Sequence, residues 1–143
     1  DQAVRNGKLN LDINDLDYKN QRLIVSSIEK CGFPQMSDVG KLAVHSVWII
    51  MHHSNKSMIA YYFQDLEKAV YNEALSSGDL AYTIDRLLMH EGYPQVYGTQ
   101  FRQGEFYTLR KPAEINRRRI WAGLPPFDQW ELENYVGLKS MTK

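Results

Sequence analysis

The segment Leu42–Met51 is apolar at every position except one His and one Ser. A helix that is apolar on nearly every side is typical of a helix surrounded by other elements. Ser37 or Asp38 can cap such a helix, which would then reach about His53. Its longest uninterrupted apolar run, Val47–Met51, is far too short to cross a bilayer, so we expect no membrane span. The segment predicts a buried central helix.

Helical spacing of apolar residues and Gly or Pro stop signals predict the other helices. They are expected at residues 17–31, 56–76, 80–91 (capped by Asp79), 112–122 and 127–135. Two stretches rich in β-formers, 96–101 and 105–109, flank Arg102-Gln103-Gly104, which predicts a β-hairpin. The expected fold is mainly α, a small bundle of about five to six helices around the central helix, with this one hairpin. We expect an N-terminal arm at residues 1–16, a single domain at 17–137 and a polar tail at 138–143.

Composition places the chain among ordinary globular proteins. Of its 143 residues, 43% are hydrophobic and 24% charged, which argues against disorder and allows a real core. The formal net charge is zero, from 17 basic and 17 acidic side chains. Nucleic-acid binders normally carry a basic excess, so no nucleic-acid partner is expected.

The sequence leaves the compartment open. Cys31 is the one cysteine, so no intrachain disulfide can form. This agrees with a reducing compartment, but some secreted proteins also have no disulfide. The chain begins with Asp1 rather than Met, which suggests a trimmed or processed product. We therefore expect a soluble protein that is either cytoplasmic or exported after removal of a targeting segment.

Metal and cofactor motifs are missing from the sequence. The four histidines, His45, His52, His53 and His90, show no zinc-binding spacing, and Cys31 has no cysteine partner. There is no phosphate-binding Gly-rich loop, dinucleotide fingerprint or Gly-x-Ser-x-Gly elbow. We expect neither a metal nor a cofactor.

Two pairs of polar residues lie on predicted helices. His52 and His53 end the central helix, where terminal carbonyls favour positive charge. They could be simple C-cap residues, or a rigidly mounted group for proton transfer. Asp85 borders the apolar face of its helix, whereas Arg86 points away from it. Asp85 and Arg86 could also be purely structural. Arg86 would then lie at the surface, and Asp85 would pair with a neighbouring helix.

A segment from Gln95 to Gln100 combines two Gln, a Tyr and a Thr around Gly98. The Gly predicts a β-bulge or a backbone that a ligand approaches closely, with the amide side chains as donors and acceptors. Further on, Arg117-Arg118-Arg119 spread around one helix, so at least one must face the protein. That arginine could pair with Asp85, and the others could be a solvated charge run.

These pieces together resemble an uncharacterised family of bacterial domains of unknown function, over about residues 18–135. The matching motifs are Gly32-x-Pro34, Val39-Gly40, Trp48 through His53, Ala81-Tyr82-x-x-Asp85-Arg86, Gly92-x-Pro94-Gln95-x-Tyr97-Gly98-Thr99-Gln100 and Arg118-Arg119-x-x-x-Gly123-Leu124-Pro125-Pro126. In the family the second helix ends in Gln-His, often followed by Ala-Asp, whereas this chain has His52-His53-Ser54-Asn55. A chemical role of that Asp is in doubt here.

The resemblance implies a shared site without implying a reaction. Its members would be His53, Asp85, Arg86, Tyr97, Thr99, Gln100 and one of the arginines. One hypothesis is an enzyme or small-ligand domain that binds or hydrolyses a small polar or anionic ligand. Its catalytic residues would be His53, Asp85 and Arg86, and its ligand-binding residues Gln95, Tyr97, Thr99, Gln100 and Arg118.

The alternative is a non-catalytic protein-interaction domain. In it Asp85, the arginines and Gln100 would form a structural polar network that holds the hairpin on the bundle. Abundant aromatic residues would supply the partner surface. Examples are Tyr61, Tyr107, Trp121 and Trp130.

Overall fold

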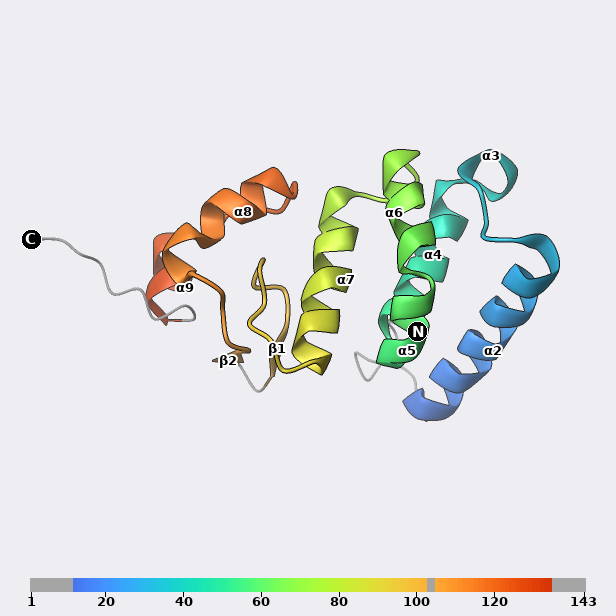
Figure 1. The fold of residues 1–143 in the computed structure, drawn as a ribbon, viewed down its shortest axis with the longest axis horizontal. Helices are drawn as coiled ribbons and strands as arrows, with labels where there is room; N and C mark the ends of the chain where they lie inside the picture. Colours follow the sequence, from blue (N-terminus) through green and yellow to red (C-terminus); the bar gives the residue numbers. More distant parts are fainter. Residues whose placement is uncertain (1–11, 103–104, 135–143) are drawn as a thin grey trace, which may run out of the picture. The chain divides into compact units, whose positions relative to one another are not determined.

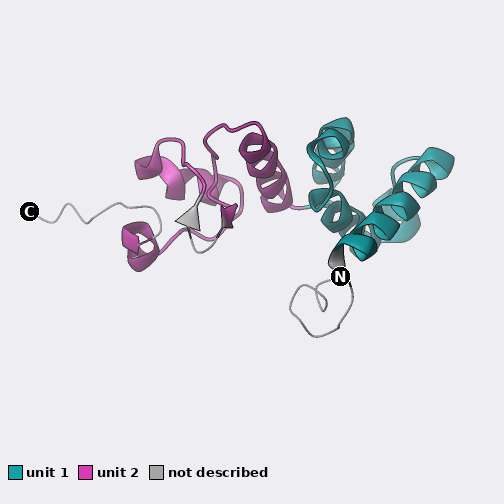
Figure 2. Cartoon of the chain, turned by 90° about the horizontal axis from the view of Figure 1, so that it is seen from below, with its two compact units in different colours: residues 1–75 teal, residues 76–143 magenta. Residues whose placement is uncertain are grey.

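A computed structural model describes residues 12–102 and 105–134 of the chain (Figure 1). The chain divides into two compact units, residues 1–75 and 76–143, which are coloured separately in Figure 2. Helices dominate the described part of both units, so the prediction of a mainly helical fold is confirmed. No helix among these described residues is long and apolar enough to cross a membrane. The single domain expected at residues 17–137 stays a prediction.

Unit 1 contains α2 (Ile13–Cys31), α3 (Met36–Val39), α4 (Lys41–His52), α5 (Lys56–Tyr61) and α6 (Phe63–Tyr71). α2 begins four residues earlier than predicted, because the Asp12 carboxylate accepts a hydrogen bond from the Asn14 amide at 2.8 Å and caps the first turn. The predicted arm at residues 1–16 therefore overlaps a helix at its end, and residues 1–11 lie outside the described part.

Two predicted helices are each divided in two. Gly40 has a φ of +80° and separates α3 from α4, so the helix predicted to start at Ser37 or Asp38 is interrupted. Tyr62 separates α5 from α6. α6 ends at Tyr71 rather than at residue 76, because Glu73 has a φ of +58° and turns the chain inward.

The core of unit 1 is built on one face of α4. Val44 and Met51 on this helix are completely buried, whereas Leu42 is 80% exposed. The helix contacts α2, α3 and α5, but its exposed Leu42 shows that the prediction of burial on all sides is wrong. The core cluster contains Val44, Val47, Trp48, Met51, Tyr62, Leu66, Ala69, Ala74 and Leu75.

Unit 2 contains α7 (Ser77–His90), β1 (Phe101–Arg102), β2 (Glu105–Phe106), the 3-10 helix η1 (Pro112–Glu114), α8 (Ile115–Trp121) and α9 (Gln129–Asn134). Ser76 rather than the predicted Asp79 is the N-cap of α7. The Ser76 hydroxyl accepts from the Asp79 amide at 3.0 Å, and the Asp79 carboxylate accepts from the Ser76 amide at 2.8 Å. This reciprocal capping box fixes the start of the helix.

The predicted hairpin with strands at 96–101 and 105–109 is not formed at that length. Two two-residue strands pair antiparallel, with Phe101 opposite Phe106 and Arg102 opposite Glu105. The turn residues 103–104 lie outside the described part. Residues 96–99 form no strand because their amides bind a side chain from α7 instead of a neighbouring strand.

Candidate functional site

Asp85 lies in the middle of α7 and is completely buried. Its carboxylate accepts five hydrogen bonds from the segment that follows the helix. The backbone amides of Val96 (2.6 Å), Tyr97 (3.1 Å to each oxygen) and Thr99 (3.0 Å) donate four of them. The Thr99 hydroxyl donates the fifth at 2.9 Å. An ionised carboxylate accepts hydrogen bonds and donates none. Both oxygens of Asp85 already accept hydrogen bonds from donors within unit 2.

The carbonyl groups of the same segment bind two arginines from α8. The Nε of Arg118 donates to the Val96 carbonyl at 2.6 Å. An amino group of Arg119 donates to the carbonyls of Tyr97 at 2.9 Å and Gly98 at 3.2 Å. The sequence allowed one inward arginine paired with Asp85, but these two inward arginines bind backbone carbonyl oxygens.

Residues 96–99 are thus held between an anion on α7 and two cations on α8. Three of the four amides bind Asp85, and three of the four carbonyls bind Arg118 or Arg119, so most of this backbone is paired although it belongs to no sheet. Burial lowers the pKa of both arginines from the ordinary value, since it penalises the charged form. Charge-assisted hydrogen bonds of this kind are stronger than neutral ones.

Gln95 is completely buried, and its side chain makes hydrogen bonds to backbone groups that a neighbouring strand would otherwise make. Its side-chain amide binds both backbone groups of Gln100, donating to the carbonyl and accepting from the N–H at 2.9 Å each. The same amide nitrogen donates to the Tyr107 carbonyl at 2.8 Å. The Gln95 side chain therefore joins the residue before β1 to the residue after β2, at the point where the short β1–β2 ladder ends.

Gly98 is required for two reasons. Its φ is +64°, a conformation that side chains with a Cβ rarely adopt. A Cβ at this position would also lie 3.2 Å from the Phe127 ring and 3.3 Å from the Leu109 side chain. The close approach expected of a ligand is made by the chain itself.

The Arg119 guanidinium lies over the Phe127 ring, with its central carbon 3.8 Å from the ring centroid. Asn116 fixes Phe127 by donating to its carbonyl at 2.8 Å and accepting from its amide at 2.7 Å. From the sequence, Arg119 was only one of three arginines that could face the protein, and Asn116 and Phe127 were missed. A signal was present for Arg119, since it follows the buried Ile115 by four residues and so shares its helix face.

Arg86, Thr99 and Gln100 form a chain of side-chain contacts at the edge of this network. Arg86 donates to the Gln100 side-chain oxygen at 3.3 Å. Gln100 in turn donates to the Thr99 hydroxyl at 3.3 Å. Seven predicted site residues therefore lie together in unit 2: Asp85, Arg86, Gln95, Tyr97, Thr99, Gln100 and Arg118.

His53, the remaining predicted residue, belongs to unit 1 and is the C-cap of α4. Its ring stands edge-on to His52, with the centroids 5.4 Å apart. Asn55, which replaces the aspartate of the resembled pattern, is the N-cap of α5 and accepts from the Met58 amide at 3.0 Å. An aspartate could make the same capping bond.

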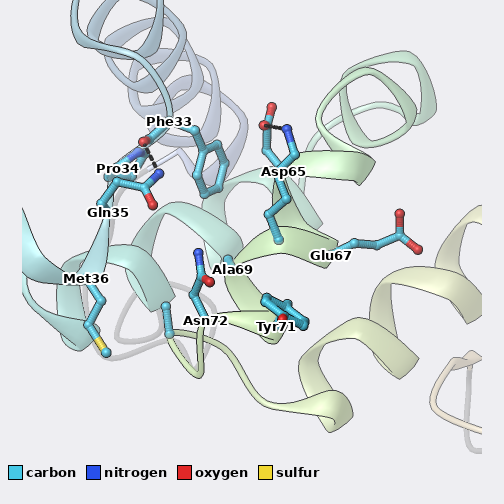
Figure 3. Close-up of a pocket in the computed structure, with 11 residues that line it drawn as sticks. Phe33, Pro34, Gln35, Met36, Asp65, Glu67, Ala69, Tyr71 and Asn72 are labelled. Carbon is cyan, nitrogen blue, oxygen red and sulfur yellow. Dashed lines mark hydrogen bonds and ion pairs between the residues drawn. The ribbon is translucent and has the colours of Figure 1, made fainter.

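Each unit also has a surface hollow. In unit 1, a hollow of about 330 Å³ lies between the Phe33–Met36 segment and α6, and Figure 3 shows the residues that line it. Two of its polar interactions are local: Gln35 donates to the Phe33 carbonyl at 2.9 Å, and Lys68 pairs with Asp65 at 3.6 Å. In unit 2, a hollow of about 360 Å³ is lined by Ser77, Leu80, Ala81, Ile84, Tyr97, Arg118, Trp121 and Ala122. The described residues contain no group of three or more His, Cys, Asp or Glu that could hold a metal ion.

Residues 5–141 match the model of a family described as "Family of unknown function (DUF6624)", and the chain belongs to that family. No curated protein and no solved structure matches the chain. The expectation of an uncharacterised family is confirmed.

Proposed function

We propose that this member of the DUF6624 family is a non-catalytic interaction domain, in which the polar residues of unit 2 are structural. The observation that carries the proposal is the set of five hydrogen bonds on the buried Asp85 carboxylate. A general base needs a free lone pair for a substrate proton, and a substrate-orienting group needs a free donor or acceptor. In unit 2 the bonds of Asp85, Gln95 and Arg118 go mainly to backbone groups.

The exposed side chains of unit 2 supply the second part of the argument. Trp121 is 77% exposed and Trp130 is 58% exposed, while Tyr93 and Phe101 are also exposed. Exposed aromatic side chains are enriched at protein interfaces, where they provide much of the binding energy. A rigid polar network beneath such a surface would hold it in one conformation before a partner binds.

Binding or hydrolysis of a small polar or anionic ligand gains less support. That hypothesis places Asp85 and Arg86 in a catalytic group with His53, and it requires Asp85 to orient the histidine. The Asp85 oxygens already accept from three residues of unit 2. The hollow beside Tyr97 and Arg118 has mostly apolar walls, which suit an apolar side chain better than a small polar ligand.

The structural part of the proposal is tested with Asp85→Asn in urea unfolding experiments on the full chain. The substitution puts an amide nitrogen beside backbone donors, and we expect a loss of about 3 kcal/mol or more in unfolding free energy. Amide exchange measured by NMR should accelerate most at Val96, Tyr97 and Thr99. Asp79→Asn in the capping box of the same helix is the control, with an expected loss of about 1 kcal/mol.

The interaction part is tested by selecting displayed random peptides on the intact chain. Recovery of sequences that bind the purified protein in solution supports an interaction domain. An Asp85→Asn protein of unchanged stability would contradict the structural role, and a selection that enriches no binder would contradict the interaction role.

A further inference from the structure

We infer that the unit 2 hollow and the cationic residues beside it bind an acidic peptide segment that carries an apolar anchor side chain. This inference rests on the proposed function, since it names the partner class of the same unit. The hollow has a volume of about 360 Å³, which suits one large apolar side chain. Leu80, Ala81, Ile84 and Ala122 form its apolar walls.

Trp121 and Arg117 form the exposed edge of the hollow. Trp121 lines it and is 77% exposed, and the Arg117 guanidinium lies 5.4 Å from the centroid of its ring. A cation over an exposed indole holds the ring in one orientation and stays available to a carboxylate. This pair joins an aromatic anchor point to a positive charge, as in the binding hot spots of many interfaces.

The charges around this edge are unbalanced. The carbonyls of Arg110 and Lys111 bind Arg118, so their segment adjoins the hollow. Glu114 is shared by Lys111 at 3.8 Å, Arg117 at 3.2 Å and Arg118 at 3.9 Å. Three cationic residues thus share one carboxylate, and Arg110 precedes them in the chain as a fourth cation, although the whole chain has a net charge of zero. We call the exposed three, Arg110, Lys111 and Arg117, the basic rim.

A basic rim selects an acidic partner by charge complementarity. The terminal segments outside the described residues do not fit this requirement by composition. Residues 1–11 contain one acidic and two basic residues, and residues 135–143 contain two lysines and no acid. A segment of another protein with Asp or Glu around a Leu, Phe or similar residue would fill the hollow and neutralise the rim together.

The test uses peptides selected on the full chain, remeasured by fluorescence anisotropy. We expect the enriched peptides to be acidic and to contain a large apolar residue whose replacement by Ala weakens binding at least about tenfold. Three variants should each weaken binding by a similar factor: Trp121→Ala, Arg117→Glu and Ser77→Phe. The last places a ring in the hollow and leaves the neighbouring N-cap residue, Ser76, unchanged. Added salt should weaken binding to the original protein more than to Arg117→Glu.

Matched controls separate this site from general effects. Tyr71→Ala removes an aromatic side chain of unit 1 that is 88% exposed, and Lys68→Glu reverses an exposed cation that, like Arg117, faces an acid three residues earlier. Neither should change binding more than about twofold, since surface substitutions outside an interface are nearly neutral. Unfolding curves of all five variants confirm that each is folded.

Three results would overturn the inference while leaving the interaction domain in place. The selected peptides could lack an acidic bias, or they could bind Trp121→Ala as tightly as the original chain. A single-stranded thymidine oligonucleotide could compete with the peptides and show the same sensitivity to Trp121 and Arg117, which would assign the surface to nucleic acid instead. Enrichment of no peptide at all would contradict the proposed function itself.

Discussion

The hydroxyl and the backbone amide of Thr99 both donate to the same oxygen of Asp85, at 2.9 Å and 3.0 Å. Both residues are buried, and they are fourteen positions apart in the chain. The pair ties the Gly98 turn to the middle of α7. It is therefore the contact at which the energy of the polar network can be measured most directly.

Thr99→Val should lower the unfolding free energy by about 1–2 kcal/mol, because it deletes the hydroxyl donor and keeps the side-chain shape. Thr99→Ser retains the hydroxyl and should cost less. The measurement is urea unfolding of each variant alone and combined with Asp85→Asn. In the combined protein the valine should cost at least about 0.5 kcal/mol less than it does alone, since its partner is already altered. Strictly additive losses would show that the hydroxyl and carboxylate do not cooperate.

Gly98→Ala and Gly123→Ala form a matched pair of substitutions. Both glycines have positive φ, +64° and +70°, so alanine costs about 1–2 kcal/mol at either position. Of the two positions, only at Gly98 would the new Cβ crowd other atoms, namely the Phe127 ring and the Leu109 side chain. Overpacking should add about 1 kcal/mol or more there.

Thermal and urea unfolding should accordingly rank Gly98→Ala well below Gly123→Ala in stability. Adding Phe127→Leu to Gly98→Ala should recover part of the difference if the ring is what crowds the Cβ. Equal losses at the two glycines would mean that only backbone conformation matters at Gly98.

The sequence predicted the helices of this fold better than its non-helical part. Apolar spacing and the stop signals near Gly32 and Gly92 placed α2 and α7, because both signals are local. The break at Gly40 was missed, since a glycine inside an apolar pattern does not reveal whether its φ is positive.

The predicted length of the hairpin strands was wrong for a long-range reason. Residues 96–101 contain the β-formers of a strand, but the amides of Val96, Tyr97 and Thr99 bind Asp85, which lies eleven residues before Val96 on another element. No local pattern shows that a distant carboxylate will replace a neighbouring strand. The resemblance did group Asp85 with Tyr97, Thr99 and Gln100, and the structure brings these residues together as mutually bonded groups.

Asn55→Ala should destabilise unit 1 by about 1 kcal/mol, since it removes the side-chain oxygen that accepts from the Met58 amide. Asn55→Asp should be neutral or slightly stabilising, because aspartate caps equally well and favours the positive end of a helix. Ser57→Ala on the exposed side of the same helix is the control and should change little. Thermal unfolding measures all three. A large loss with aspartate would show that Asn55 needs its amide nitrogen for another contact.

Tyr62 makes the stability of unit 1 depend on alkaline pH. Burial, reinforced by the neighbouring Tyr61 hydroxyl, raises the pKa of the Tyr62 phenol above its ordinary value of 10.0. The folded state therefore holds this proton more tightly than the unfolded state does. Its contribution to stability is fully present below about pH 10 and is lost as the pH rises through the folded-state pKa.

Urea unfolding measured between neutral pH and about pH 11 should show this alkaline loss in the original protein. Tyr62→Phe removes the titrating group and keeps the ring in the core, so its stability should fall less steeply over the same range. Tyr71→Phe is the matched control, because Tyr71 is 88% exposed and so lies outside the core. Identical pH profiles for Tyr62→Phe and the original protein would contradict the prediction. The loss of stability at alkaline pH would then come from other groups.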